Sequence, residues 1–128
     1  MSLNGAVGRG SDKGSAKHGV DHWWAQRATA VALVLLSVWF VVSLLSIPTI
    51  NFAAVTAWMS RGWNTVPLVA LILVAAQHSY LGLRVVVEDY VHDPGRRIAL
   101  LLLLRFAHTL IAAAAVIAVF EVAFGGVA

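Results

Sequence analysis

The chain of 128 residues is 60% hydrophobic and 12% charged, contains no cysteine, and carries a formal net charge of +3. A soluble domain of this size is about 45–50% apolar and about 25% charged, so we predict an integral membrane protein, and three helical spans of roughly 20 apolar residues leave no room for a soluble catalytic domain. The absence of cysteine excludes disulfides and thiolate metal sites, and the scattered Lys and Arg residues favour no nucleic-acid partner.

The first stretch, residues 1–20, is rich in glycine and serine and contains no apolar core of a signal peptide. We therefore predict a flexible cytoplasmic arm there. Residues 21–128 are expected to form a three-helix membrane domain that inserts by its own helices, as in a multi-pass protein of a bacterial inner membrane.

The first apolar run, ATAVALVLLSVWFVVSLLSIPTI, predicts a membrane span over about residues 28–50, with Pro48 close to its end. Residues 51–64 are only partly apolar. Their two tryptophans, Trp58 and Trp63, are typical of an interfacial belt, which is compatible with a short amphipathic helix lying on the membrane surface.

Two further spans are predicted over about residues 66–87 and 98–120. Pro67 is tolerated near the start of the second span because a first-turn N–H has no helical partner. The sequence EDYVHDPGRR between the two spans predicts a polar loop, with its turn at Asp93-Pro94-Gly95. Together these runs predict an all-α integral membrane fold with three transmembrane helices.

Lysine and arginine are distributed unevenly between the two sides of these spans. Seven of them precede the first span or flank the connection between spans two and three, whereas only Arg61 lies between spans one and two. The seven are Arg9, Lys13, Lys17, Arg27, Arg84, Arg96 and Arg97. Because cytoplasmic loops carry the excess of positive charge, we expect the N-terminus in the cytoplasm and the C-terminus in the periplasm.

His78 lies deep in the second span, about ten residues or roughly 15 Å from its cytoplasmic edge. A neutral imidazole at this depth needs a partner, either a hydrogen bond to a neighbouring helix or a haem iron, for which histidine is the common axial ligand. Gly82 lies one turn further on the same face. It leaves space beside the imidazole for a flat macrocycle, although small residues are also typical of helix–helix packing.

Asp89 and Tyr90 mark the cytoplasmic end of the same span. Asp89 follows His78 by eleven residues, which returns to nearly the same helical face, and Tyr90 is turned from it by about a quarter to a third of a circle. A tyrosine O–H beside an acid can donate to a carbonyl oxygen of a lipid-soluble ligand. A tyrosine at this depth is equally typical of an aromatic belt.

The third span carries Arg105 and His108 on one face. Arg105 either extends toward the headgroups or pairs with an acidic group such as a haem propionate. His108 is expected at the same depth as His78, so geometry alone would allow both histidines to ligate one haem within this chain.

Two motifs resemble those of a known family. His78-x-x-x-Gly82 followed by Asp89-Tyr90, near the end of the second of three spans, resembles the hydrophobic membrane anchor of succinate dehydrogenase, the D-type subunit of complex II. The segment GVDHWWAQRATA, residues 19–30, is similar to that family's segment of Gly-Val, an acid and a histidine, and then Arg-x-Thr-Ala. The resemblance covers most of the chain from Gly19 onward.

This resemblance implies that the chain is half of a heterodimeric anchor bundle, with a haem b between it and a C-type cytochrome b anchor subunit. It implies that His78 supplies one axial ligand to the haem iron and the partner the other. Tyr90 would hydrogen-bond ubiquinone near the cytoplasmic face, with Asp89 beside it, and Arg27 would lie near the haem propionates and the quinone pocket. The resemblance assigns no role to His108 beyond excluding it as an iron ligand, so a helix–helix hydrogen bond, a propionate contact and a proton route stay open, and we favour the first two.

The function implied is that of an anchor subunit of succinate:ubiquinone oxidoreductase. Such a subunit does not oxidise succinate; it holds a flavoprotein subunit and an iron–sulfur subunit to the membrane, where electrons from the iron–sulfur clusters reduce ubiquinone. Two alternatives stay open from the residues themselves. One is a small stand-alone cytochrome b that uses His78 and His108, and the other is a haem-free membrane scaffold protein.

Overall fold

The computed structural model describes residues 4–125, with side chains from residue 17 onward, and within this range the chain is entirely helical apart from short connections. The elements are α1 (Asn4–Leu45), α2 (Phe52–Met59), α3 (Gly62–Tyr90) and α4 (Pro94–Ala123). Three stretches are long and apolar enough to cross a membrane, namely Lys17–Leu45, Gly62–Tyr90 and Pro94–Ala123. The predicted all-α class with three membrane spans is confirmed.

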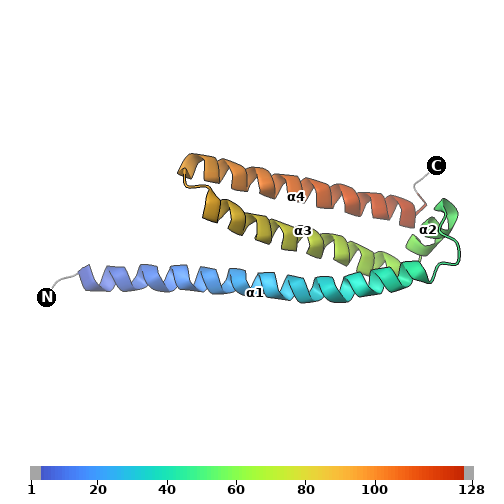
Figure 1. Ribbon diagram of the computed structural model, residues 1–128, viewed down its shortest axis with the longest axis horizontal. Helices are drawn as coiled ribbons and strands as arrows, with labels where there is room; N and C mark the ends of the chain where they lie inside the picture. Colours follow the sequence, from blue (N-terminus) through green and yellow to red (C-terminus); the bar gives the residue numbers. More distant parts are fainter. Residues whose placement is uncertain (1–3, 126–128) are drawn as a thin grey trace.

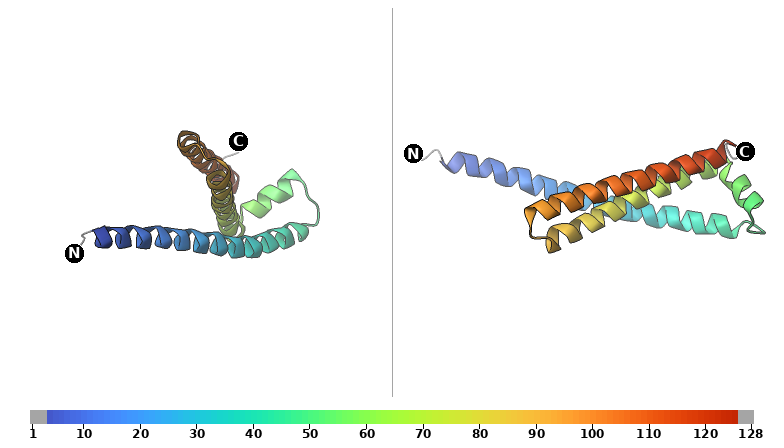
Figure 2. Two further views of the ribbon diagram at one scale, coloured as in Figure 1. Left: turned by 60° about the vertical axis from the view of Figure 1, so that its left-hand side comes forward. Right: turned by 90° about the horizontal axis from the view of Figure 1, so that it is seen from above.

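The central helix of the arrangement is α3, which packs against α4 on one side and against α1 on another. Figure 1 shows α3 and α4 as an antiparallel pair, with α1 running along α3 and projecting past the α3–α4 connection. Seen from above, α1 crosses the α3–α4 pair at an angle (Figure 2). Among the described residues α1 and α4 do not pack against each other, so the three long helices do not form a closed bundle.

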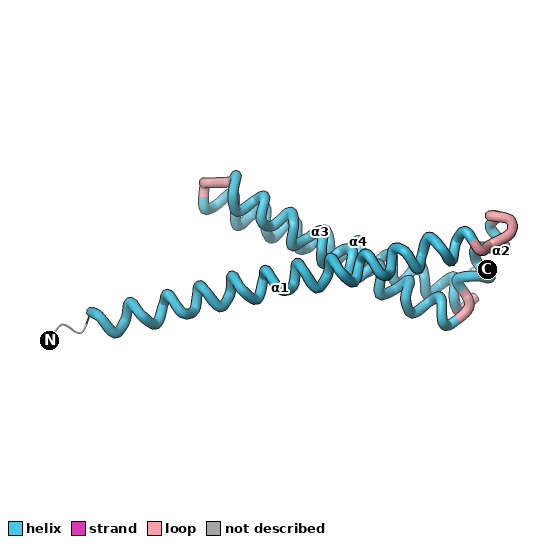
Figure 3. Tube along the Cα trace, turned by 60° about the horizontal axis from the view of Figure 1, so that its bottom comes forward, coloured by secondary structure: helices cyan, strands magenta, loops and turns pink. Residues whose placement is uncertain are grey.

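The connections lie at two opposite ends of the molecule. The loops around α2 and the C-terminal end of α4 lie at one end, and the short α3–α4 connection lies at the other (Figure 3). The N-terminal half of α1 extends on the side of the α3–α4 connection. This arrangement is compatible with the orientation predicted from the charge distribution, because the N-terminal half of α1 and the α3–α4 connection lie toward one end and the α2–α3 connection, which holds Arg61, toward the other. The orientation itself stays a prediction.

The helix ends differ from the ends of the predicted spans. Helices α3 and α4 extend beyond the spans predicted over residues 66–87 and 98–120 at both ends. The first span was expected to run to residue 50, but α1 ends at Leu45, because Pro48 disfavours helical geometry in the residue before it. Pro67 lies inside α3, five residues after Gly62, so the expectation that it occupies the first turn is wrong. Helix α1 reaches back to Asn4, so residues 4–20 continue the first helix, and the flexibility of this arm stays a prediction.

The predicted ten-residue loop between the last two spans is much shorter in the structure. Only Val91, His92 and Asp93 separate α3 from α4. The carboxylate of Asp93 accepts a hydrogen bond of 2.8 Å from the backbone N–H of Arg96, and Pro94 occupies the first helical position. Both are favourable at a helix N-terminus, so the turn residues begin α4 immediately instead of extending the loop.

The hydrophobic core lies at the α2 end of the molecule and consists of Trp58, Leu68 and Val119. Trp58 is 7% exposed and stacks on Trp39 of α1 with ring centroids 5.9 Å apart. Trp58 therefore packs inside the protein, whereas Trp63 is 75% exposed, and the location of both tryptophans at the membrane interface stays a prediction. Helix α2 packs against α3 and α4 at this end of the structure.

Candidate functional site between α1 and α3

His78 of α3 faces α1, where its ring nitrogen Nδ1 lies 3.0 Å from Oγ1 of Thr29. The same hydroxyl group lies 2.8 Å from the carbonyl oxygen of Ala25 and 3.1 Å from that of Gln26, both on its own helix. The imidazole is partly buried at the crossing of the two helices. The contact is a hydrogen bond to a neighbouring helix, one of the two partners that the sequence left open for His78, and it leaves the second ring nitrogen, Nε2, available for another partner.

A groove of about 510 Å³ opens between α1 and α3, one helical turn from His78 toward the α3–α4 connection. It is lined by Gly19, His22, Trp23, Gln26, Gly82 and Val85. A methyl group added at Gly82 would lie 3.8 Å from Nε2 of Gln26, an ordinary contact distance. Packing between α1 and α3 therefore does not itself require glycine at position 82, and the missing side chain adds open space to the groove.

Two polar atoms on the side chains that line this groove lack a hydrogen-bond partner. They are Nε2 of His22 and Oε1 of Gln26. Both atoms are buried, although each residue as a whole is only partly buried. Burying a polar atom without a partner costs roughly 1–3 kcal/mol. A group from outside this chain that offers both a hydrogen-bond donor and an acceptor would satisfy them. Of the neighbouring pair Asp21 and His22, it is thus the histidine that lines the groove.

Arg27 lies beside this groove on α1, and its guanidinium carbon is 5.1 Å from the ring centroid of Trp23. The side chain is exposed, so the charge is stabilised by the aromatic face and is free to meet an anion. Position 27 therefore places a cation over Trp23, which lines the groove, and the predicted role of Arg27 near a haem propionate stays a prediction.

Asp89 and Tyr90 lie at the last turn of α3, far from His78. Tyr90 is the final residue of the helix and is 78% exposed, and Asp89 is exposed as well. Twelve residues of helix separate Tyr90 from His78, a rise of about 18 Å. The structure thus places a phenol and a carboxylate at the end of α3, and it does not bring them into contact with the imidazole.

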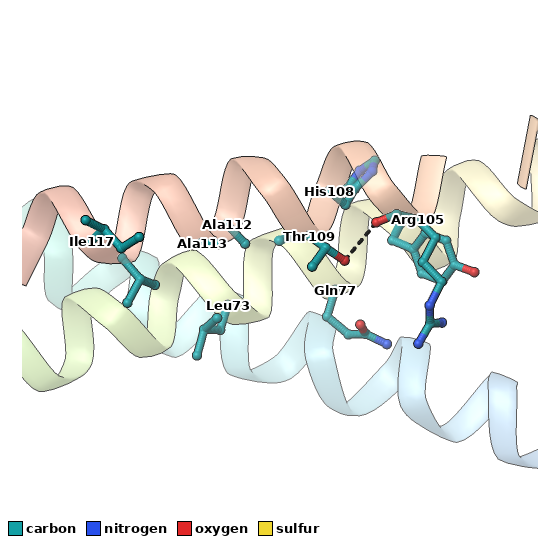
Figure 4. A pocket seen from close by; sticks show the side chains of 11 residues that line it. Leu73, Gln77, Arg105, His108, Thr109, Ala112, Ala113 and Ile117 are labelled. Atoms are coloured by element: carbon teal, nitrogen blue, oxygen red, sulfur yellow. Dashed lines mark hydrogen bonds between the residues drawn. The ribbon is translucent and has the colours of Figure 1, made fainter. Parts of the chain in front are cut away.

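A second polar cluster lies between α3 and α4, on residues that the first groove does not use. A cavity of about 480 Å³ is lined by Tyr80, Arg105 and His108 at its polar end and by Ala112, Ala113 and Ile117 beyond them (Figure 4). The Arg105 guanidinium carbon lies 5.7 Å from the Tyr80 ring centroid, so a cation–π contact stabilises part of its charge.

Both ring nitrogens of His108 have partners within the chain. Nδ1 lies 2.8 Å from the carbonyl oxygen of Leu104, and Nε2 lies 3.2 Å from the hydroxyl oxygen of Ser79. Ser79 and His78 are successive residues and point about 100° apart around α3. The structure therefore directs His78 toward α1 and His108 toward a different side of α3, and it does not bring the two imidazoles to one ligand position.

Among the described residues no three His, Asp or Glu side chains gather into a group that could hold a metal ion. Sequence reasoning identified His78 and Gly82 but assigned no role to Gln26 or Thr29. Their spacing from His22, at four and seven residues, places all three on one face of a helix, and that periodicity was the available signal.

Comparisons with known proteins identify the family of the chain. A family model described as succinate dehydrogenase/fumarate reductase transmembrane subunit matches residues 1–119. Succinate dehydrogenase hydrophobic membrane anchor subunits are similar over most of the chain. That of Rickettsia bellii is 32% identical over 112 residues, covering 88% of this chain and 90% of the relative. That of Paracoccus denitrificans is 28% identical over 101 residues, covering 79% and 78%. No solved structure gives a significant match.

Proposed function

Because the chain belongs to the family of succinate dehydrogenase/fumarate reductase transmembrane subunits, we propose that it anchors succinate dehydrogenase in a bacterial inner membrane and contributes a haem ligand and part of the quinone site. The anchoring role is supported by the three candidate membrane spans. It is also supported by relatives that are named membrane anchor subunits and that are similar to this chain over most of their length. The haem and quinone roles rest on the residues of the two sites described above.

The observation that carries the haem proposal is the environment of His78. This imidazole lies at mid-span, keeps Nε2 free of the contact to Thr29, and lies one helical turn from a groove in which His22 and Gln26 each present an unpartnered buried atom. These residues fit a haem b held at the edge of the chain. His78 would bind the iron, and His22 with Arg27 would bind the propionates. Haem supplies one-electron transfer when it is bound there.

Tyr90 and Asp89 suit the quinone end of the site. The Tyr90 O–H donates a hydrogen bond to a ubiquinone carbonyl and orients the ring at the cytoplasmic rim. Asp89, next to it, would tune that hydrogen bond or the supply of protons from cytoplasmic water. Reduction of one quinone to quinol consumes two electrons, delivered by the iron–sulfur subunit, and two protons from this side.

The open faces of α1 and α4 are where the other subunits dock in this proposal. A C-type cytochrome b anchor would supply the second axial ligand, since His78 faces α1 while His108 contacts Ser79 on a different side of α3. The iron–sulfur and flavoprotein subunits would bind on the cytoplasmic side, close to Tyr90. The competing proposal, a stand-alone cytochrome b ligated by His78 and His108, requires His108 to give up the hydrogen bond of one ring nitrogen and to turn toward the side of α3 on which His78 lies.

Replacing each histidine separately in the assembled complex tests this proposal. His78→Ala is expected to abolish the low-spin haem spectrum, because it removes one of the two axial ligands. His108→Ala is the matched control at a similar depth in α4 and is expected to keep that spectrum. A pyridine haemochrome assay gives the haem content of each variant. An unchanged low-spin signal in His78→Ala, or its loss in His108→Ala, would contradict the proposed ligation.

A further inference from the structure

We propose that Thr29 is a positioning residue for His78, in that its hydroxyl group selects the imidazole tautomer with hydrogen on Nδ1 and thereby leaves the Nε2 lone pair for the iron. This inference rests on the proposed function, since it concerns the ligand that His78 provides. It assigns a role to the threonine of the Arg27-x-Thr29-Ala30 segment, which in this structure is the residue of α1 that contacts the imidazole.

The protons of this contact can be assigned from the three oxygen and nitrogen neighbours of Oγ1. A threonine hydroxyl has one hydrogen to donate and two lone pairs with which to accept. The carbonyl oxygens of Ala25 and Gln26 lie 2.8 and 3.1 Å from Oγ1, and a carbonyl oxygen can only accept. The single hydroxyl hydrogen is therefore donated to the backbone of α1.

The alternative assignment is electrostatically unfavourable. If the hydroxyl hydrogen pointed at an unprotonated Nδ1, the lone pairs of Oγ1 would face the lone pairs of a carbonyl oxygen only 2.8 Å away, with no hydrogen between them. With its hydrogen on the α1 backbone, Oγ1 presents a lone pair to His78. The 3.0 Å contact is then a hydrogen bond donated by Nδ1–H to Oγ1.

This tautomer is the one that a metal ligand through Nε2 requires. A metal-bound histidine donates its other ring N–H to an acceptor, which fixes the orientation of the ring and raises the basicity of the ligating nitrogen. Thr29 also fixes the rotation of the imidazole about its own bond to the backbone, because α1 holds the hydroxyl through the two carbonyl contacts. The ligand is thus oriented before any partner subunit contributes to the site.

The chain offers a matched control for the hydroxyl group itself. Thr109 of α4 also donates to the carbonyl oxygen four residues earlier, at 2.8 Å from that of Arg105 (Figure 4). No histidine nitrogen is bonded to its Oγ1. Thr109→Val therefore removes a backbone-bonded hydroxyl in a membrane helix without changing the environment of His78, whereas Thr29→Val removes the hydroxyl that accepts from His78.

The test is a redox titration of the haem in the assembled complex, with Thr29→Ser, Thr29→Cys, Thr29→Val and Thr109→Val compared. Loss of the acceptor weakens Nε2 as a donor to ferric iron, so the midpoint potential is expected to rise in the order Ser, Cys, Val. A tenfold loss of ferric over ferrous affinity corresponds to about 59 mV. In Thr29→Val the affinity of the complex for haem, followed through its haem content, is expected to fall roughly 10- to 100-fold. Thr109→Val is expected to match the wild type.

The outcomes separate this inference from the proposed function. If His78→Ala loses the low-spin haem but Thr29→Val and Thr29→Cys keep the wild-type potential and haem content, Thr29 is not a positioning residue and the haem proposal stands. If His78→Ala keeps the haem, the proposed ligation is refuted, and the inference about Thr29, which depends on it, is refuted as well. Should Thr29→Val not assemble, the comparison of serine with cysteine decides, since equal potentials in these two would overturn the inference.

Discussion

Tyr90 is the residue at which the quinone proposal can be tested without disturbing the haem. Its phenol ends α3 in an exposed position, and about 18 Å of helix separates it from His78. Tyr90→Phe removes only the hydroxyl group and no packing contact. We expect quinone reduction to fall by roughly tenfold or more, the loss of a hydrogen bond worth about 1.5 kcal/mol at the reacting carbonyl.

The control for this substitution is succinate oxidation by a soluble artificial acceptor, which takes electrons before they reach the membrane. This activity is expected to stay at the wild-type level in Tyr90→Phe, as is the haem spectrum. Equal loss of both activities would indicate an assembly defect and would refute a specific role for the phenol in binding quinone.

Among the elements, α2 is attached to the start of α3 by two buried side chains. Asn64 donates from Nδ2 to the carbonyl oxygen of Trp58 at 2.8 Å, and Thr65 donates to that of Met59 at 2.6 Å. Thr65 is only 6% exposed. These bonds satisfy carbonyl groups at the end of α2, which the helix itself cannot pair. They hold α2 against the long helices so that Trp58 enters the core.

Thr65→Val is expected to loosen this attachment while preserving side-chain volume. It leaves the Met59 carbonyl without its side-chain partner, at a cost of about 1–3 kcal/mol, which increases the locally open population roughly 5- to 150-fold. Trypsin cleavage after the exposed Arg61, between α2 and α3, reports that opening in detergent. Thr56→Val is the control, since Thr56 bonds only to its own helix; cleavage of Thr65→Val at the rate of this control would contradict the expectation.

The helices and the two sites differ in how far sequence alone predicts them. The spacing of His78, Gly82, Asp89 and Tyr90 lies within one helix, so helical periodicity is enough to relate them. The roles of Thr29 and Trp58 depend on which faces of different helices meet. That choice is made by side-chain packing and by bonds such as those of Thr65, which hydrophobic periodicity does not encode. The positions of the site residues within α3 were therefore predictable from the sequence, whereas the contact between His78 of α3 and Thr29 of α1 was not.

For the whole molecule, the length of α3 relates the two sites to the membrane. Its 29 residues extend about 44 Å, which matches the roughly 40–45 Å of a bilayer with its headgroups. His78 lies two residues past the middle of this helix and Tyr90 at its end. The haem ligand is therefore expected at mid-membrane depth and the phenol among the headgroups, where a quinone head can meet both lipid and water.

The orientation of the chain is the last expectation and can be measured because the protein contains no cysteine. Seven basic residues lie on the side of the N-terminus and the α3–α4 connection, so this side is expected in the cytoplasm. Single cysteines at Ser60 and His92, both exposed, mark the two sides. In intact cells an impermeant maleimide is expected to label Ser60→Cys, which faces the periplasm. His92→Cys is expected to react only after the membrane is opened and the soluble subunits are removed with SDS. The reverse pattern would place Tyr90 in the periplasm and would separate the proposed quinone site from the iron–sulfur subunit that reduces it.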